Sequence, residues 1–235
     1  MGVSLKYLFF TAVLLVCSVV NGQNPAQING YEFVDLGLSV RWAKCNIGAH
    51  TPEDYGDYFA WGETYTKSSY NRMSYKYFGE TYDRFSYTKY LGNNNPYDKD
   101  DFSINMEDDA AFVLWGAPWR MPSKAEIDEI VRMCDWVFDK VNDVQGCWAI
   151  SKVNGNRIFF PLAGYKCDDE LLDSGLSGKY WGGEIRKDMC FEAYQIWISY
   201  KDSLAEMEKK TMILLSDDGY REYGRPIRPV CPIKD

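Results

Sequence analysis

The sequence predicts an α+β fold, because two amphipathic helical segments are followed by segments with the alternation and turn signals of antiparallel β-hairpins. The chain has 235 residues, of which 46% are hydrophobic and 16% aromatic, so it can bury a sizeable core. This composition argues against a disordered chain.

The N-terminal segment has the features of a secretory signal peptide. Lys6 supplies a positive charge, and Tyr7–Val20 is a mostly apolar run of 14 residues, too short to span a membrane comfortably. We therefore expect residues 1–22 to be removed on export. The mature chain is expected to be secreted or held at the cell surface, without a transmembrane segment.

The cysteines fit this exported setting. A lipoprotein anchor on Cys17 is an alternative, disfavoured because bulky Val16 stands where a lipobox needs a small residue. Loss of residues 1–22 leaves an even number of cysteines, which suggests disulfides with 15 alternative pairings. A zinc-type site is disfavoured, because there is no C-x-x-C motif and His50 is the only histidine. The disulfide candidates are Cys45, Cys134, Cys147, Cys167, Cys190 and Cys231.

The formal net charge of −8 limits the class of partner. A chain without a basic block does not bind nucleic acid by neutralising phosphates. No cationic amphipathic stretch suggests binding to a membrane surface. The expected partner is a glycan or a protein ligand outside the cytoplasm.

The chain shows no Pro/Gly/Ser-rich linker and no clear internal repeat. Residues 23–30 form a short lead, and residues 31–233 are expected to form a single domain. Within it, residues 65–101 are rich in Tyr, Asn, Ser, Lys and Asp and have little periodicity. They predict a long irregular insertion, and loops of that length are usually functional or mobile.

The first predicted helix covers Met106–Trp115. Carboxylates occupy its first turn, where they favour the helix dipole. Its packing face is expected to consist of four apolar residues. These are Ala110, Ala111, Val113 and Leu114.

The second predicted helix begins with a capping box. Ser123 and Glu126 have the required spacing and follow Pro122 directly. One apolar face then continues at helical spacing. Its members are Ile127, Ile130, Val131 and Cys134.

The remaining segments predict strands. The segments YEFVDLG and LSVRWAKC open the domain, and CWAISKV and NRIFFPL flank Asn154-Gly155, a strong hairpin signal. The segment AYQIWISY alternates in the manner of a half-buried strand. The segments KTMILLS and YREYGRPIRPVC flank Asp217-Asp218-Gly219, which is expected to form a turn.

Five segments together resemble the Fibrobacter succinogenes major paralogous domain family. They are YEFVDLGLSVRWAKCNIGA, PEDYGDYFAWGET, EDDAAFVLWGAPWRMPSKAEIDEI, NGNRIFFPLAGY and GRPIRPV, and they span Tyr31 to Val230. The resemblance implies an exported protein of a gut-type bacterium of the Bacteroidetes. It also implies a fold similar to the C-type-lectin and formylglycine-generating-enzyme group. In that fold two helices pack on twisted antiparallel sheets, loops are long, and the terminal strands pair.

This chain departs from the family pattern in places. YWGGEI stands where the family usually has Tyr-Trp-Ser-Ser, and three cysteines are additional. The resemblance implies Cys167–Cys190 as an added staple and Cys45–Cys134 as the preferred second pair. That choice leaves Cys147 and Cys231.

The resemblance favours structural roles for two aromatic motifs. In the stretch EDYGDYFAWGET, Trp61 and its aromatic neighbours are expected to pack over the sheet, with a sugar-gripping loop as the alternative. In WRMP, Trp119 is expected to pack in the core and Arg120 to make a buried hydrogen-bonded contact next to Pro122.

An oxygen-rich cluster in the insertion is a candidate calcium site. Asp98, Asp100 and Asp101 supply carboxylates, and oxygen ligands suit calcium. Their spacing matches no EF-hand loop, and the C-type-lectin calcium signatures are absent. A solvated loop is the favoured interpretation, and no cofactor other than calcium is expected.

These features predict a non-enzymatic binding module that recognises a carbohydrate or a protein surface through its loops. A structural or fimbria-associated surface subunit is the alternative, followed by a glycan-acting enzyme with a carboxylate pair. No residue marks a serine or cysteine as a catalytic partner of His50. The predicted ligand-binding residues are Tyr180, Glu184, Arg186, Tyr220, Arg221 and Tyr223.

Overall fold

The computed structural model describes residues 26–79, 87–94, 102–201 and 211–233. Antiparallel sheets dominate these residues, and two α-helices accompany them, which is compatible with the predicted α+β class. No helix in this part of the chain has the length and apolar character needed to cross a membrane. The predicted signal peptide, residues 1–22, lies outside the described residues, as do Cys17 and the calcium candidates Asp98, Asp100 and Asp101.

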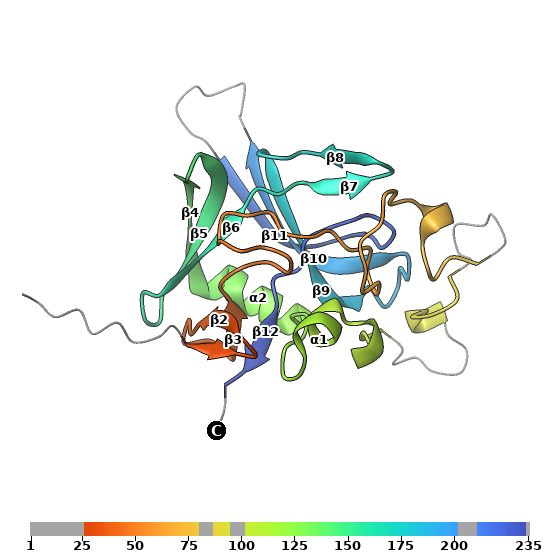
Figure 1. Cartoon of the computed structure of the whole chain (residues 1–235), viewed down its shortest axis with the longest axis horizontal. Coiled ribbons are helices and arrows are strands. Elements are labelled where there is room, and N and C mark those ends of the chain that lie inside the picture. Colours follow the sequence, from red (N-terminus) through yellow and green to blue (C-terminus); the bar gives the residue numbers. More distant parts are fainter. Residues whose placement is uncertain (1–25, 80–86, 95–101, 202–210, 234–235) are drawn as a thin grey trace, which may run out of the picture.

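The first strands and the last strand share one sheet. Its spatial order is β1 (Gln27–Ile28), β2 (Tyr31–Val34), β3 (Val40–Ala43) and β12 (Val230–Pro232). Trp42 of β3 stands opposite Val230 of β12, so segments from the two ends of the described chain are hydrogen-bonded neighbours (Figure 1). The predicted opening strands are therefore confirmed, as is the pairing of terminal strands.

The second sheet contains the predicted Asn-Gly hairpin. Its order is β4 (Cys134–Val141), β5 (Val144–Ser151) and β6 (Arg157–Pro161). Gly155 takes a φ of +75° in the loop between β5 and β6, a left-handed conformation that glycine adopts at low cost. The hairpin prediction is confirmed.

The third sheet holds the longest strands. Its order is β11 (Thr211–Tyr220), β10 (Glu192–Lys201) and β9 (Ser177–Ile185). A small hairpin of β7 (Tyr165–Cys167) and β8 (Glu170–Leu172) joins β9 through the Gly164–Gly178 bridge (Figure 1). The turn predicted at Asp217-Asp218-Gly219 is wrong, because these residues continue β11 and pair with residues 193–195 of β10.

Helix α2 (Lys124–Met133) begins where the sequence predicts. The Ser123 hydroxyl accepts a hydrogen bond from the Glu126 N–H, and the Ser123 N–H donates one to the Glu126 carboxylate. Ile127 and Ile130 are buried, and the helix lies against both the second and the third sheet. Cys134 does not belong to the helix; it opens β4 in extended conformation.

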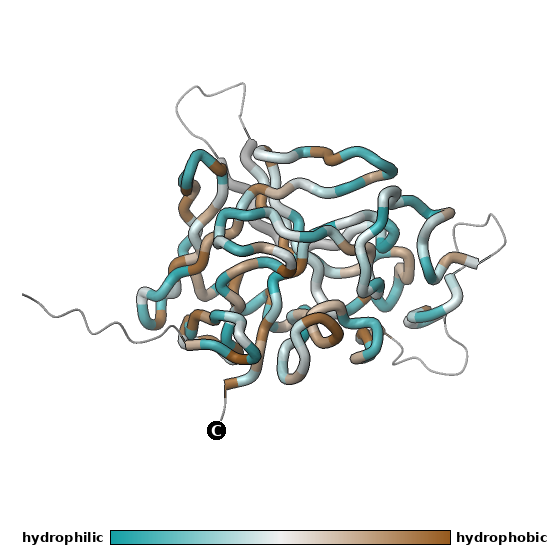
Figure 2. The backbone as a smooth tube through the Cα atoms, in the orientation of Figure 1, coloured by the Kyte–Doolittle hydropathy of each residue, from teal (hydrophilic) through white to brown (hydrophobic). Residues whose placement is uncertain are grey.

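Helix α1 (Ala110–Trp115) is shorter than predicted. A 3-10 turn, Met106–Asp108, precedes it, and Asp109 caps it in extended conformation by accepting hydrogen bonds from two helical N–H groups. Its sequence is apolar throughout and colours brown in Figure 2. The predicted packing face is only half right: Ala110 and Ala111 are buried, but Val113 and Leu114 are exposed.

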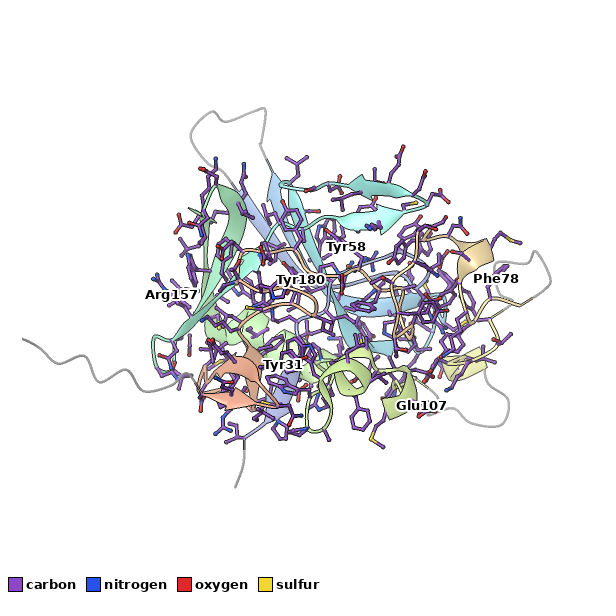
Figure 3. The ribbon with its side chains drawn as sticks, viewed as in Figure 1. Tyr31, Tyr58, Phe78, Glu107, Arg157 and Tyr180 are labelled. Carbon is purple, nitrogen blue, oxygen red and sulfur yellow. The ribbon has the colours of Figure 1, made fainter. Side chains whose placement is uncertain are left out.

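The core is aromatic, and the stretch EDYGDYFAWGET belongs to it. Phe59 and Trp61 are buried, and the Trp61 indole donates a hydrogen bond to the Gly182 carbonyl at 2.8 Å. Tyr58 is buried and lies in the interior in Figure 3, as does Tyr180. The packing interpretation of this stretch is therefore confirmed.

The WRMP motif behaves as predicted in part. The Trp119 ring is buried, and its indole donates to the Ile28 carbonyl at 3.0 Å. Arg120 is half-buried rather than buried, and it forms two hydrogen bonds with Glu126, at 2.8 and 2.5 Å. Pro122 is buried directly before α2.

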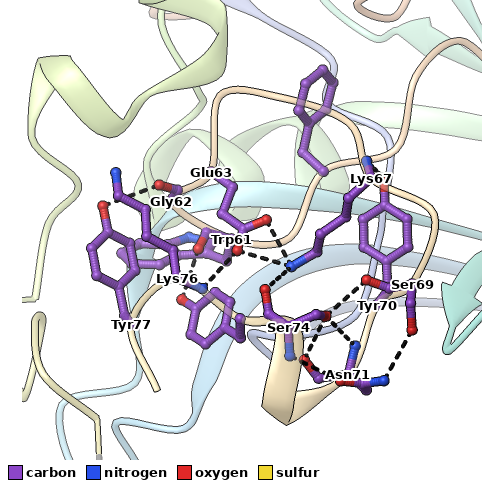
Figure 4. A network of polar contacts seen from close by, with 12 residues as sticks. Trp61, Gly62, Glu63, Lys67, Ser69, Tyr70, Asn71, Ser74, Lys76 and Tyr77 are labelled. Carbon is purple, nitrogen blue, oxygen red and sulfur yellow. Dashed lines mark hydrogen bonds and ion pairs between the residues drawn. The ribbon is translucent and has the colours of Figure 1, made fainter. Parts of the chain in front are cut away.

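The insertion at residues 65–101 is irregular in its described part, but five of its described tyrosines are core residues, whereas Tyr65 is exposed. Lys67 bridges the Glu63 carboxylate and the Ser74 carbonyl, each at 2.9 Å, and so folds the segment over Trp61 (Figure 4). The buried tyrosines of the insertion are Tyr70, Tyr75, Tyr77, Tyr87 and Tyr90.

Asp108 anchors the same insertion to the segment before α1. Its carboxylate accepts hydrogen bonds from Lys89 at 2.6 Å, Lys76 at 2.9 Å and the Tyr90 hydroxyl at 2.7 Å. Burial acts to raise the pKa of Asp108, but these donors outweigh it and hold the pKa well below the usual range. Asp108 is therefore a structural anion, and the predicted helix-dipole role is secondary.

All the cysteines of the described residues carry free thiols. Neither of the implied disulfides, Cys45–Cys134 and Cys167–Cys190, is formed, and the remaining Cys147 and Cys231 are free as well. Burial raises the pKa of the Cys134 thiol to about 11 and that of the Cys147 thiol to about 12. Both side chains behave as small core residues in this structure.

Candidate functional site

An aromatic groove lies on the face of the β9–β10–β11 sheet that also meets the β7–β8 hairpin. Its volume is about 220 Å³. That is below the 300–1,000 Å³ of typical sites for drug-sized ligands, so it suits a single ring or side chain. The groove is lined by Lys179, Glu192, Gln195, Trp197, Gly219, Tyr220 and Arg225.

Strand alternation places these side chains. In β10, Gln195 and Trp197 point to the groove, whereas Ile196 and Ile198 point to the core on the other face. Lys179 of β9 stands directly opposite Trp197 in the register. The indole Nε1 of Trp197 is buried and has no hydrogen-bond acceptor among the described residues.

A chain of aromatic rings forms one border of the groove. Tyr220 is 41% exposed and contacts Tyr223 edge-to-face, with ring centroids 5.6 Å apart. Tyr223 in turn contacts Tyr165 at 5.7 Å, and Phe191 contacts Tyr220 at 6.0 Å. Together these rings present a half-exposed apolar border beside polar groups.

Charged side chains of both signs surround the groove. The Lys179 ammonium lies 3.7 Å from the Tyr165 ring centroid and 3.6 Å from the Asp173 carboxylate. The Glu192 carboxylate lies 3.4 Å from the Arg186 guanidinium. Arg225 stacks on the buried Trp181 ring at 3.9 Å. Neither sign of charge dominates, which does not favour a strongly ionic ligand.

Two tyrosines at the border of the groove, Tyr223 and Tyr165, stay protonated at physiological pH. Burial, followed by the neighbouring Cys167 thiol, raises the pKa of Tyr223 to about 12. Burial also raises the pKa of Tyr165. Each hydroxyl therefore remains a neutral group that both donates and accepts hydrogen bonds.

The structure gathers only part of the predicted ligand-binding set. Tyr220 lines the groove, Tyr223 borders it, and Arg186 reaches it through Glu192. Glu184 lies apart from them, in a different cleft, beside Ser123 and Met121.

Two members of that set are structural, and their prediction as ligand contacts is wrong. Tyr180 is buried, and its hydroxyl donates to the Pro161 carbonyl. Arg221 is fully buried among aromatic rings and donates to three backbone carbonyls. Arg221 follows the exposed Tyr220, and Tyr180 follows the half-buried Lys179, so the sequence alone did not reveal that both are buried.

Sequence reasoning missed Lys179, Gln195 and Trp197 as groove residues. The signal was present in AYQIWISY, where Gln195 and Trp197 alternate with isoleucines and so share a face of mixed polarity. The place of Lys179 in the groove could not be predicted from the sequence, because it follows from the register of β9 against β10.

Groups that suggest catalysis have structural partners. Among the described residues, the buried carboxylates Glu63, Asp108, Asp109 and Glu222 each contact cations or N–H and O–H donors. His50 and Cys45 line one cleft of about 240 Å³. Burial raises the pKa of the Cys45 thiol, which is the reverse of what a nucleophile needs.

The described residues contain no cluster of His, Cys, Asp and Glu side chains suited to hold a metal ion. Comparison of the chain with family models, with curated proteins and with solved structures finds no match.

Proposed function

We propose that this chain is an exported, non-enzymatic binding module that recognises a carbohydrate through the aromatic groove. The proposal includes a C-type-lectin-like fold and membership of the Fibrobacter succinogenes major paralogous domain family. The five motifs of the sequence support the family. The pairing of β3 with β12 and the packing of α2 on antiparallel sheets support the fold.

The observation that carries the carbohydrate proposal is the combination of aromatic faces with neutral hydrogen-bonding groups. A sugar ring has an apolar face of C–H groups and a rim of hydroxyls. Tyr220 and Trp197 offer aromatic ring surface for the apolar face of the sugar, and Gln195 offers an amide that can hydrogen-bond to its hydroxyls. The mixture of positive and negative side chains around the groove favours a neutral sugar over a strongly ionic one.

A glycan array with the mature chain, residues 23–235, tests this function. We expect reproducible binding of neutral glycans, and we expect Tyr220→Ala to weaken it by about tenfold through loss of one ring face. Tyr220→Phe keeps the ring and is expected to retain most of the binding. Arrays run with calcium and with chelator separate a metal-dependent site from a metal-free one.

Tyr65→Ala is the matched control, because Tyr65 is 50% exposed and lies outside the groove. Equal binding by the Tyr220→Ala and Tyr65→Ala variants would remove the site from the groove. Absence of glycan binding in both conditions would move the proposal to a protein ligand.

A structural surface subunit is the second candidate, and strand β11 favours it. β11 has 10 residues and pairs with β10 on one side, with no strand on its other side among the described residues. A long open edge offers backbone groups to another chain. If this candidate holds, the mature chain self-associates in light scattering, and a TMILLS peptide competes with the association. A monomer at every concentration would exclude it.

A further inference from the structure

A second cleft lies apart from the aromatic groove and shares no lining residue with it. Its volume is about 400 Å³, within the range of small-molecule sites. It lies between the segment that enters α1, the loop at residues 117–121 and strand β9. Its apolar walls come from Ile104, Met106, Phe112, Pro118, Trp119 and Met121.

Buried hydrogen bonds hold this cleft in shape. The Asp109 carboxylate accepts from the Ala111 N–H at 2.8 Å and from the Met121 N–H at 2.8 Å, so it fixes α1 against the opposite wall. Gly183 donates to the Pro122 carbonyl and accepts from the Ile104 N–H, each at 2.8 Å. The cavity is therefore preformed, and ligand binding does not have to order its walls.

The charges at the cleft leave one carboxylate uncompensated. Arg120 is neutralised by its two hydrogen bonds to Glu126. The Asp109 oxygens are taken up by backbone N–H groups. Glu184 accepts one long hydrogen bond, at 3.2 Å from the Lys124 N–H, and makes no ion pair among the described residues.

Exposed apolar side chains surround the same helix. Met106, which lines the cleft, is 65% exposed, and Val113 and Leu114 are 48% and 45% exposed. Large apolar groups left in water near a cavity are typical of a binding surface. Of these three side chains, only Met106 lines the cleft; Val113 and Leu114 lie on α1 outside its lining.

We propose that this cleft binds an apolar amine, a ligand whose aromatic or branched aliphatic body fills the cavity and whose ammonium group faces Glu184. The apolar walls supply the binding energy through removal of the ligand body from water. Glu184 supplies the preference for a cation, because among the described lining residues it is the carboxylate with the fewest hydrogen-bond donors, whereas Asp109 is held by three backbone N–H groups. This inference does not depend on the carbohydrate proposal.

Three small probes of equal size test the charge preference: phenethylamine, 2-phenylethanol and phenylacetate. We expect phenethylamine to bind about tenfold more tightly than phenylacetate, with the alcohol in between. Titrations are followed by NMR of a chain labelled with ¹³C in its methionine methyl groups. Met106 and Met121 line the cleft, so their signals should shift and saturate, whereas Met73, which is 67% exposed elsewhere, should not move.

Glu184→Gln is expected to remove most of the preference for the amine while leaving 2-phenylethanol binding unchanged. Glu107→Gln is the control, because Glu107 is an exposed carboxylate nearby that pairs with Lys89 and does not line the cleft. Equal binding of amine and carboxylate by the unaltered chain would overturn the proposal. So would shifts of Met73 equal to those of Met106 and Met121, or no saturable shift with any probe.

Discussion

Replacing Arg221 with methionine is expected to lower the free energy of unfolding by about 3–4 kcal/mol. The guanidinium is fully buried and donates to the Tyr90 carbonyl at 3.0 Å, the Cys190 carbonyl at 2.7 Å and the Tyr75 hydroxyl at 3.0 Å. It also lies 4.9 Å from the centroid of the Trp61 ring. Methionine fills much of the space but leaves the buried carbonyls without a donor.

Urea unfolding at neutral pH measures this effect. Arg132→Met is the matched control, because Arg132 is exposed on α2 and the same substitution there should change stability by less than about 0.5 kcal/mol. Arg221→Lys keeps the charge but cannot reach all the acceptors at once, so its loss should be intermediate. Similar stabilities for the Arg221→Met and Arg132→Met variants would show that the insertion is held by its tyrosines alone.

Gly164→Ala is expected to destabilise the protein by about 3 kcal/mol or more. Gly164 has a φ of +64°, and a Cβ atom at this position would lie 2.1 Å from the Leu172 carbonyl oxygen. The obstructing atom is backbone, so the whole β7–β8 hairpin would have to shift. Because Tyr165 follows directly and borders the aromatic groove, the same shift should weaken ligand binding there.

Gly175→Ala separates the two causes of the expected destabilisation at Gly164, which are the left-handed backbone conformation and the clash of the added Cβ atom. Gly175 has a φ of +76°, but a Cβ atom there meets no atom within 4 Å. Gly175→Ala should therefore lower the free energy of unfolding only by the cost of placing alanine in a left-handed conformation, about 1–2 kcal/mol. Thermal unfolding of both variants gives the difference. If the two losses are equal, the contact with Leu172 relaxes freely and the hairpin is not rigidly placed.

Elements determined by residues close together in the sequence were predicted correctly, whereas those determined by distant contacts were not. The Ser123–Glu126 capping box and the Asn154-Gly155 hairpin were predictable because their interactions span few residues. The start of α1 was misplaced, because Asp109 also accepts from the Met121 N–H and acts as a cap only in the folded chain. The Asp217-Asp218-Gly219 turn failed because strand pairing with β10 overrode a local preference.

In the candidate site, too, locally determined features were predictable from the sequence and long-range contacts were not. Tyr220 and Tyr223 were found from composition, since tyrosine-rich segments near the surface favour binding. Arg221, between them, was misassigned because all of its hydrogen-bond partners except the Cys190 carbonyl lie more than a hundred residues away, in the insertion. The tyrosines of that insertion carry no periodicity, so nothing local revealed that they surround a buried cation.

The pairing of β3 with β12 has a kinetic consequence. Arg228, just before β12, is also bonded to the Lys44 carbonyl, at a sequence separation of 184 residues, and to the Asn46 side chain at 182. Contacts between residues this far apart in the sequence form late in folding, because closing the long intervening loop costs conformational entropy. During synthesis, β3 cannot pair with β12 until nearly all of the described chain has been made. Until then the edge of β3 that pairs with β12 is exposed and can pair with strands of other chains.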